Sequence, residues 1–187
     1  MKPNITSGAS NKPARHHTHS MVLAALFAAL LSILSQITIP MAPVPINLAL
    51  LAVYLCAMVL QPGWAAASVG LYLLMGLLGL PVFSGLRGGP SSLFGITGGY
   101  LWGYILTAGA VSLLSPLADR FFKRVLVLSL GLLCCYIPGT LWLMMLTGRG
   151  WSQALPLAVY PFLPGDAIKI VMAAALAPRM KRTLKGL

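Results

Sequence analysis

The sequence predicts an all-α membrane protein with six transmembrane helices, and three observations support this fold class. Of its 187 residues, 58% are hydrophobic and only 8% are charged, whereas charged residues make up about a quarter of a typical soluble domain. Its long apolar runs approach the roughly 20 residues that a helix needs to cross a bilayer. Its 13 basic residues, against 2 acidic ones, lie mostly at the ends of these runs, where they indicate membrane topology rather than binding of nucleic acid.

Residues 1–20 are predicted to form a disordered cytoplasmic tail, because they mix small polar and basic residues without apolar periodicity. The three histidines of the chain, His16, His17 and His19, all lie in this tail, so no further histidine completes a metal site and we expect none. The first span is predicted over residues 21–39. A proline-rich segment follows it in place of the cleavage site of a signal peptide, so we expect the span to be retained.

Small residues form two overlapping faces on this first span. Ala24 and Ala28 define one face, and Ala25 and Ala29 define the other, each with the small-x-x-x-small spacing. Such faces let two helices approach closely within lipid. The pattern predicts that something packs against this helix, without indicating what.

The next three spans are predicted over residues 47–60, 65–80 and 96–115. Three prolines within residues 40–45 exclude a helix there and predict a rigid connection between the first two spans. Residues 81–92, before the fourth span, are rich in Gly and Pro and carry Arg87. Irregular backbone near a membrane is tolerated where it is buried in protein or lines a wet cavity, so we expect this loop to form the wall or lid of a cavity.

The fifth span is predicted over residues 125–147, with a kink at Pro138, and the sixth over residues 160–178. Residues 116–124 carry Asp119 and three basic residues and should form an aqueous loop. Residues 148–156 are predicted to be a turn. The six-helix domain thus extends over residues 21–182, and a short basic tail, residues 183–187, ends the chain.

The basic residues place both termini in the cytoplasm. With the N-terminus inside, the inner segments carry ten basic residues and the outer loops carry only Arg87 and Arg149, as the positive-inside rule requires. The inner ten are Lys2, Lys12, Arg15, Arg120, Lys123, Arg124, Arg179, Lys181, Arg182 and Lys185. The loop with Arg87 then lies on the outer side, together with the start of the sixth span.

Two charged residues, Asp166 and Lys169, lie within the sixth apolar run. A helix that begins near Pro164 places both on one face, with the carboxylate near the helix end that favours it. Charges at membrane depth cost at least about 2.5 to 3.5 kcal/mol each on insertion scales, so they normally face a cavity or each other. Either the two charges form an ion pair that only locks helix packing, or they bind a solute.

A solute held by Asp166, Lys169 and Arg87 would meet one acceptor and two cations. It should therefore carry hydrogen-bond donors together with an anionic or strongly accepting group. Tyr100, beside two glycines, is predicted to line the cavity, whereas Trp102 and Phe162 fit either a cavity wall or an interfacial anchor.

Catalysis has little support in this sequence. A serine nucleophile in the membrane would lack a histidine base, and a carboxylate dyad would need a second acid beside Asp166. No phosphate-binding G-x-x-x-x-G-K-[ST] motif is present, so active transport would need another subunit or an ion gradient. We expect no enzyme. A structural assembly factor with an internal ion pair is a further alternative.

Three motifs, in this order on six spans, resemble the BioY family, the biotin-binding S components of energy-coupling factor (ECF) vitamin transporters. They are Pro81-Val82-Phe83, Gly95-x-Thr97-Gly98-Gly99-Tyr100-Leu101 and Pro161-Phe162-Leu163-Pro164-Gly165-Asp166-x-x-Lys169. The resemblance covers residues 21–177 and implies the S-component fold in a prokaryotic plasma membrane. It also implies that the subunit captures biotin from outside and releases it inward when coupled to a T subunit and two ABC-type ATPases. Biotin is then the transported ligand, and no cofactor is expected.

The resemblance also implies roles for individual residues. Asp166 would accept a hydrogen bond from the ureido ring of biotin, Lys169 would donate one to an oxygen, and Arg87 would bind the valerate carboxylate. The other residues implied at the biotin site are Tyr100, Gly99 and Asn47. In S components an Ala-x-x-x-Ala motif docks on the T subunit, and here that motif is Ala24 with Ala28 or Ala25 with Ala29.

The sequence departs from the family pattern at two positions near the expected site. Ala49 stands where family members usually carry Gln, and Ile96 stands where they usually carry Pro. Both departures concern ligand contacts rather than architecture. An S component or a stand-alone carrier for another small vitamin is therefore the alternative interpretation.

Overall fold

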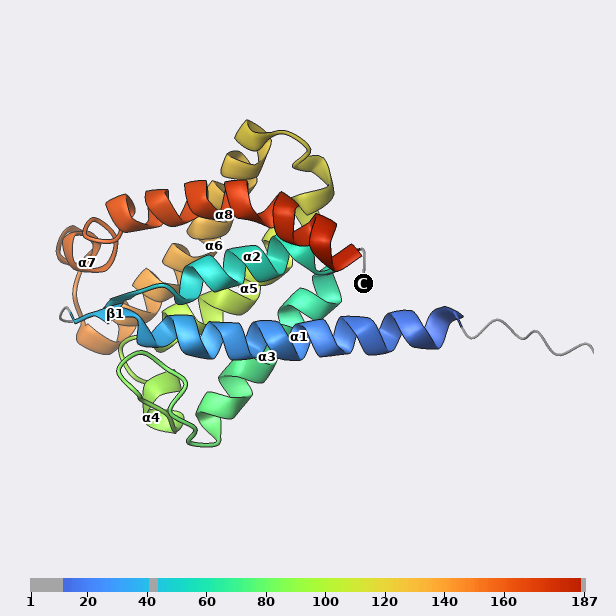
Figure 1. The fold of residues 1–187 in the computed structure, drawn as a ribbon. Coiled ribbons are helices and arrows are strands. Elements are labelled where there is room, and N and C mark those ends of the chain that lie inside the picture. The colour runs from blue at the N-terminus through green and yellow to red at the C-terminus, as the bar shows by residue number, and fades with distance from the viewer. Residues whose placement is uncertain (1–11, 41–43, 186–187) are drawn as a thin grey trace, which may run out of the picture.

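The computed structural model describes residues 12–40 and 44–185, which form an almost entirely helical bundle (Figure 1). In chain order its elements are α1 (Lys12–Gln36), β1 (Thr38–Ile39), β2 (Ile46–Asn47), α2 (Ala49–Val59), α3 (Pro62–Leu77), α4 (Pro90–Leu93), α5 (Gly98–Leu114), the short 3-10 helix η1 (Ser115–Leu117), α6 (Phe121–Thr147), α7 (Trp151–Ala158) and α8 (Leu163–Lys185). The strands β1 and β2 pair antiparallel, with Thr38 opposite Asn47. This hairpin is a small exception to the predicted all-α class.

Each predicted span contains a helix, but the helices differ in their capacity to cross a membrane. Within the described residues, three helical segments are long and apolar enough: His17–Gln36, Gly98–Leu117 and Phe121–Thr147. The pair α7 and α8, bent by 51° at the break between them, makes a fourth if it counts as one span. Helices α2 and α3 have only 11 and 16 residues.

Helix α2 is short and is enclosed by the rest of the bundle. It contacts α1, α3, α5 and α8, and every residue in it except the last is buried. Its mean apolarity is high on all sides, which is typical of a helix buried within protein.

Three sequence predictions about the ends of helices were wrong. Residues 12–20 continue α1 instead of forming a disordered tail, because Pro13 suits a first helical turn and no helix breaker follows it; residues 1–11 lie outside the described part of the chain. The predicted turn over 148–156 is largely replaced by α7, whose Ala154 and Ala158 face the core one turn apart. Helix α8 extends to Lys185, well beyond the predicted end of the sixth span.

Glycines allow α5 to pack closely along α6. A Cβ atom at Gly103 would lie 2.9 Å from the Cys135 carbonyl oxygen, and one at Gly99 would lie 2.3 Å from the Cβ of Trp142. Both separations are too short for a side chain. The two longest internal helices therefore meet backbone to backbone, which fixes one wall of the bundle.

The two alanine faces of α1 have different surroundings. Ala24 and Ala28 are buried in the bundle, where α1 packs against α2 and α3, and the Ala24 carbonyl oxygen accepts a hydrogen bond of 2.8 Å from Ser68 Oγ of α3. Ala25 and Ala29 are exposed. Of the two alternative faces expected to dock on a partner, the chain itself covers Ala24 and Ala28, and the face of Ala25 and Ala29 is accessible.

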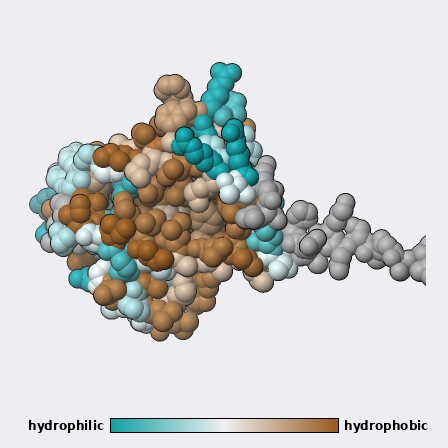
Figure 2. All heavy atoms as spheres, viewed as in Figure 1, coloured by the Kyte–Doolittle hydropathy of each residue, from teal (hydrophilic) through white to brown (hydrophobic). Residues whose placement is uncertain are grey.

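The polar residues gather at the two ends of the bundle. The start of α1 and the end of α8 lie at one end, whereas the β1–β2 hairpin, α4 and α7 lie at the other (Figure 1). Apolar residues cover the middle of the face shown in Figure 2, with hydrophilic residues toward both ends. Large apolar side chains such as Leu26, Ile33, Leu106 and Met145 are more than half exposed. A surface of this kind is suited to lipid rather than to water.

Candidate functional site

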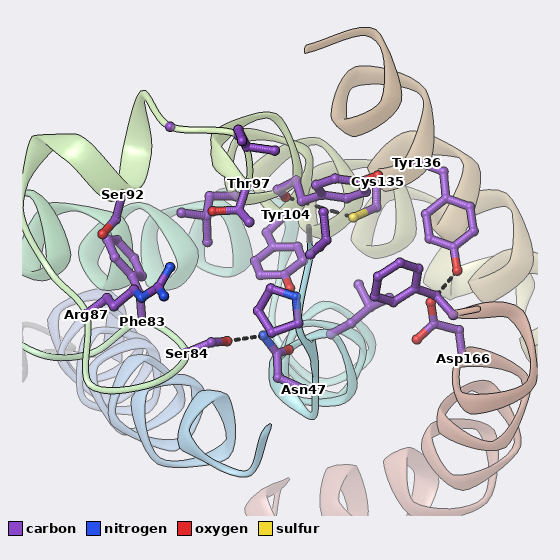
Figure 3. Close-up of a pocket in the computed structure, with 18 of the residues that line it drawn as sticks. Asn47, Phe83, Ser84, Arg87, Ser92, Thr97, Tyr104, Cys135, Tyr136 and Asp166 are labelled. Atoms are coloured by element: carbon purple, nitrogen blue, oxygen red, sulfur yellow. Dashed lines mark hydrogen bonds between the residues drawn. The ribbon is translucent and has the colours of Figure 1, made fainter. Parts of the chain in front are cut away.

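A cavity of about 560 Å³ lies at the end of the bundle that carries the hairpin, α4 and α7. Its walls come from the start of α2, the segment over residues 83–97, the first half of α5, the middle of α6 and the start of α8. Figure 3 shows Arg87 and Ser92 on one side of this cavity and Tyr136 and Asp166 on the other. The volume falls within the range of about 300 to 1,000 Å³ that is usual for small-molecule sites.

A buried ion pair forms one side of the cavity. Lys169 Nζ lies 2.7 Å from Asp166 Oδ1, and the two side chains are only 7% and 4% exposed. Tyr136 donates a hydrogen bond of 2.5 Å from α6 to the second carboxylate oxygen, Oδ2. Asp166 thus joins α6 to α8 through its side chain, and all three residues line the cavity.

The beginning of α8 positions this pair. The helix starts at Leu163, which confirms the predicted start near Pro164, and Asp166 lies in its first turn, where the helix dipole favours a carboxylate. Lys169 follows at i+3 on the inward face, which continues through Ala173 and Ala177. The regular spacing of buried residues along α8 therefore brings both charges to the interior.

The ion pair retains unused hydrogen-bonding capacity. Each carboxylate oxygen of Asp166 accepts one hydrogen bond and can accept another. The Lys169 ammonium has three donors, and within the described chain one of them has a partner, Asp166. Buried donors without partners are costly, so this corner is suited to a ligand that presents both an accepting oxygen and an N–H group.

Arg87 forms the other side of the cavity, and its guanidinium is paired with no carboxylate of residues 12–40 and 44–185. The chain has two acidic residues, and each is paired with a lysine: Asp166 with Lys169, and Asp119 with Lys123 at 2.8 Å. The hydrogen bond from Lys123 lowers the pKa of the exposed Asp119, which therefore stays ionised at neutral pH. The exposed guanidinium of Arg87 is thus free to bind an anion from outside the chain.

Asn47 and Tyr100 line the cavity, but their polar atoms already have partners. Asn47 donates from Nδ2 to Ser84 Oγ, and its Oδ1 accepts a hydrogen bond of 3.0 Å from the backbone N–H of Ala49. The Tyr100 hydroxyl donates to the Ala158 carbonyl oxygen at 2.9 Å. These contacts fix the start of α2 and tie α5 to α7, so both residues shape the walls of the cavity.

The remaining sequence candidates are divided between the cavity and the outer surface. Gly99 is absent from the cavity lining among the described residues and instead faces Trp142 on α6. Phe162 lines the cavity and is 8% exposed. Trp102 is 40% exposed and lies beside Phe94, with ring centroids 6.5 Å apart, so it belongs to the surface.

Sequence reasoning missed several polar residues at the cavity, of which Tyr136 is the most important. A tyrosine in a membrane span needs a partner for its hydroxyl, and Asp166 is the only acid in an apolar run, so the pairing had a recognisable signal. Ser84 and Ser92 also line the cavity, from the segment predicted to be its wall or lid, and Thr97 lines it from the residue before α5. Ile96 lines the cavity as well, whereas Ala49 is buried in α2 and does not reach it.

The fold and the cavity define a multi-pass membrane protein with a solute-sized site inside its helix bundle. The family model described as the BioY family matches residues 6–186. The chain is 35% identical to a Lactococcus lactis protein named biotin transporter BioY2, over 89% of this chain and 92% of that protein. It is 36% identical to the biotin transporter BioY of Thermotoga maritima, over 87% of this chain and 95% of that protein.

A solved structure shares the fold. It is the crystal structure described as the S-component for biotin from an ECF-type ABC transporter, with a TM-score of 0.80 and 26% identity over 94% of this chain and 95% of the other. This chain belongs to the BioY family. It is therefore a multi-pass transport protein of the plasma membrane and not an enzyme.

Proposed function

We propose that this protein is the biotin-binding S component of an ECF-type transporter. The observation that carries the proposal is a cavity with a buried Asp166–Lys169 pair on one side and the unpaired cation of Arg87 on the other. Biotin has matching chemistry, with ureido N–H groups and a carbonyl oxygen at one end and a carboxylate at the other. The names of the relatives support the same ligand.

In this proposal, Asp166 accepts a hydrogen bond from a ureido N–H and Lys169 donates one to the ureido oxygen. Tyr136 holds the carboxylate of Asp166 in place, so that the ring meets an acceptor of fixed orientation. Arg87 binds the valerate carboxylate at the mouth of the cavity. Tyr104 and Phe162 provide apolar surface for the fused rings and the alkyl chain.

We further propose six membrane crossings with both termini in the cytoplasm. The short helices α2 and α3 would then cross the membrane while packed against α1 and α5, and α2 would also pack against α8. Arg120, Arg124 and the basic end of α8 would lie on the cytoplasmic side, as the positive-inside rule favours. The cavity, at the opposite end of the bundle from the start of α1 and the end of α8, would open outward and capture biotin from the exterior.

Release into the cell would require coupling to a T subunit and two ABC-type ATPases. This chain carries no nucleotide-binding motif, so the energy must come from elsewhere. The exposed face of Ala25 and Ala29 is the surface we propose for docking on the T subunit, since small residues allow close helix contact in lipid.

The docking face predicts that Ala29→Leu reduces copurification of the T subunit and the ATPases by at least about tenfold, because a branched side chain separates the two helices. Binding of biotin by the isolated subunit should not change. The matched control is Ala167→Leu, which enlarges an exposed alanine on α8. Copurification at the wild-type level for Ala29→Leu would exclude this face from docking.

The proposed ligand is tested with purified wild-type protein in detergent. We expect it to retain radiolabelled biotin, with competition by unlabelled biotin and none by thiamine or riboflavin. Saturable binding of a different vitamin would instead support an S component or carrier of other specificity. If no small ligand binds, the cavity is not a vitamin site and the proposal fails.

A further inference from the structure

Arg87 lies on a segment that has little structure of its own. This segment, residues 79–89, connects α3 to α4 and is called here the cavity loop. Its backbone is closed by a pair of hydrogen bonds between Phe83 and Arg87, at 2.9 and 3.2 Å. Between them, Gly85 and Leu86 both have positive φ angles, of 73° and 57°. A leucine rarely adopts this conformation, so its surroundings must enforce it.

An aromatic anchor attaches the first half of the cavity loop to α3. The Phe83 side chain is 3% exposed and packs edge to face on Tyr72, with ring centroids 5.3 Å apart. Its ring fills the space above Gly76, where a Cβ atom would lie 2.0 Å from the ring. This apolar contact keeps the loop on the bundle but does not reach Leu86 or Arg87.

A side chain of α1, that of Gln36, holds the turn at Leu86. Gln36 is the last residue of α1, and its Oε1 accepts a hydrogen bond of 3.0 Å from the backbone N–H of Leu86. Its Nε2 lies 3.2 Å from the carbonyl oxygens of both Pro81 and Phe83. The amide of Gln36 therefore bridges the two sides of the turn that precedes Arg87.

Neighbouring contacts orient the Gln36 amide for this task. Its Nε2 also lies 3.2 Å from the Ser32 carbonyl oxygen and 3.1 Å from Ser35 Oγ, so its two hydrogens are directed among acceptors on α1 and on the loop. Ser35 in turn donates to the Val82 carbonyl oxygen. Only an amide provides both the donors and the acceptor that this arrangement uses.

We propose that Gln36 is a positioning residue for ligand binding: its amide holds the turn at residues 85–86 in its left-handed conformation and so directs the guanidinium of Arg87 to the mouth of the cavity. The inference rests on the proposed function, in which Arg87 binds the carboxylate of biotin. Gln36 itself does not line the cavity in the described structure, so it acts through Arg87.

The test compares biotin with biotin methyl ester, which keeps the ureido ring but has no negative charge. Kd values for both ligands are measured on wild-type protein, Gln36→Ala, Arg87→Ala and the double variant. The control is Gln61→Ala, which truncates an exposed glutamine at the start of α3 whose side chain makes no capping hydrogen bond. The melting temperature of each variant in detergent is recorded in parallel.

We expect Gln36→Ala to weaken binding of biotin by about tenfold and binding of the ester by less than about threefold, since a misdirected charge-assisted hydrogen bond loses most of its contribution. The double variant should bind biotin no more weakly than Arg87→Ala alone. Hydrogen exchange at the Leu86 amide should accelerate in Gln36→Ala, while amides in α5 and α6 keep their protection. Gln61→Ala should behave like wild type.

Equal weakening of both ligands by Gln36→Ala, or additive effects in the double variant, would overturn the inference and show a general structural role. Unchanged binding of biotin together with unchanged exchange at Leu86 would also overturn it. In each of these cases wild-type protein still binds biotin, so the proposed function stands. Failure of wild-type protein to bind biotin at all would instead overturn the proposed function and this inference with it.

Discussion

Lys169→Ala is expected to abolish retention of labelled biotin and to lower the melting temperature of the purified protein. The substitution removes the only cation paired with Asp166 in the described structure and leaves the carboxylate of that buried residue without a counter-charge. Removing one partner of a buried ion pair typically costs about 3 to 5 kcal/mol, because the other charge remains buried and uncompensated. Binding is measured with radiolabelled biotin, and stability by thermal unfolding in detergent.

A second substitution separates the role of Lys169 in folding from its role in binding. In Asp166→Asn with Lys169→Ala, the uncompensated charge is gone, so stability should largely recover. Binding should remain absent, because the double variant lacks both the ionised acceptor and the ammonium donor that we propose for the ureido ring.

The exposed ion pair between Asp119 and Lys123 provides the control for Lys169→Ala. Lys123 pairs with Asp119 at 2.8 Å, but both side chains are more than half exposed. Exposed pairs contribute little to stability, so Lys123→Ala should change neither biotin binding nor the melting temperature. If Lys169→Ala behaved like Lys123→Ala and bound biotin with wild-type affinity, the buried pair would have no part in the site.

The sequence predicted the charged parts of the site because they follow from local spacing. Asp166 and Lys169 are three residues apart after a proline that starts a helix, so one helical face had to carry both. The cavity loop was recognisable because its glycines and prolines exclude a helix next to an apolar span. In both cases the prediction depends only on residues that lie within about ten positions of each other in the sequence.

Features that depend on contacts between distant segments were not predictable in this way. The two alanine faces of α1 are equivalent in sequence, and only the packing of α2 and α3 against α1 decides that Ala24 and Ala28 are covered while Ala25 and Ala29 are exposed. The contact of Gln36 with Leu86 joins residues 50 positions apart. Nothing near Gln36 in the sequence indicates that its amide reaches the cavity loop.

Gly99 was expected to lie at the ligand site, but in the structure it contacts α6. The family resemblance implied Gly99 at the biotin site, and a glycine allows either a ligand or another backbone segment to approach closely. In the structure, a Cβ atom at Gly99 would lie 2.7 Å from the Pro138 carbonyl oxygen as well as against Trp142. The space at Gly99 is therefore used by α6, and only Tyr100 contributes to the cavity wall.

We accordingly expect Gly99→Ala to destabilise the fold without a direct effect on the ligand. Overpacking of a tight helix contact costs about 1 to 3 kcal/mol, and here the colliding atoms belong to backbone and to a side-chain Cβ that cannot move aside. The melting temperature should fall, whereas the Kd for biotin of the protein that remains folded should stay within about twofold of wild type.

Gly109→Ala is the matched control for this prediction. Gly109 is on the same helix, α5, but a Cβ atom there would meet nothing within 4 Å. Replacing a glycine in an open helical position by alanine favours the helix by about 1 kcal/mol, so the melting temperature should rise or stay unchanged. A Gly99→Ala protein that melts like wild type but has lost biotin binding would reverse the assignment, because the space at Gly99 would then belong to the ligand and not to the contact between α5 and α6.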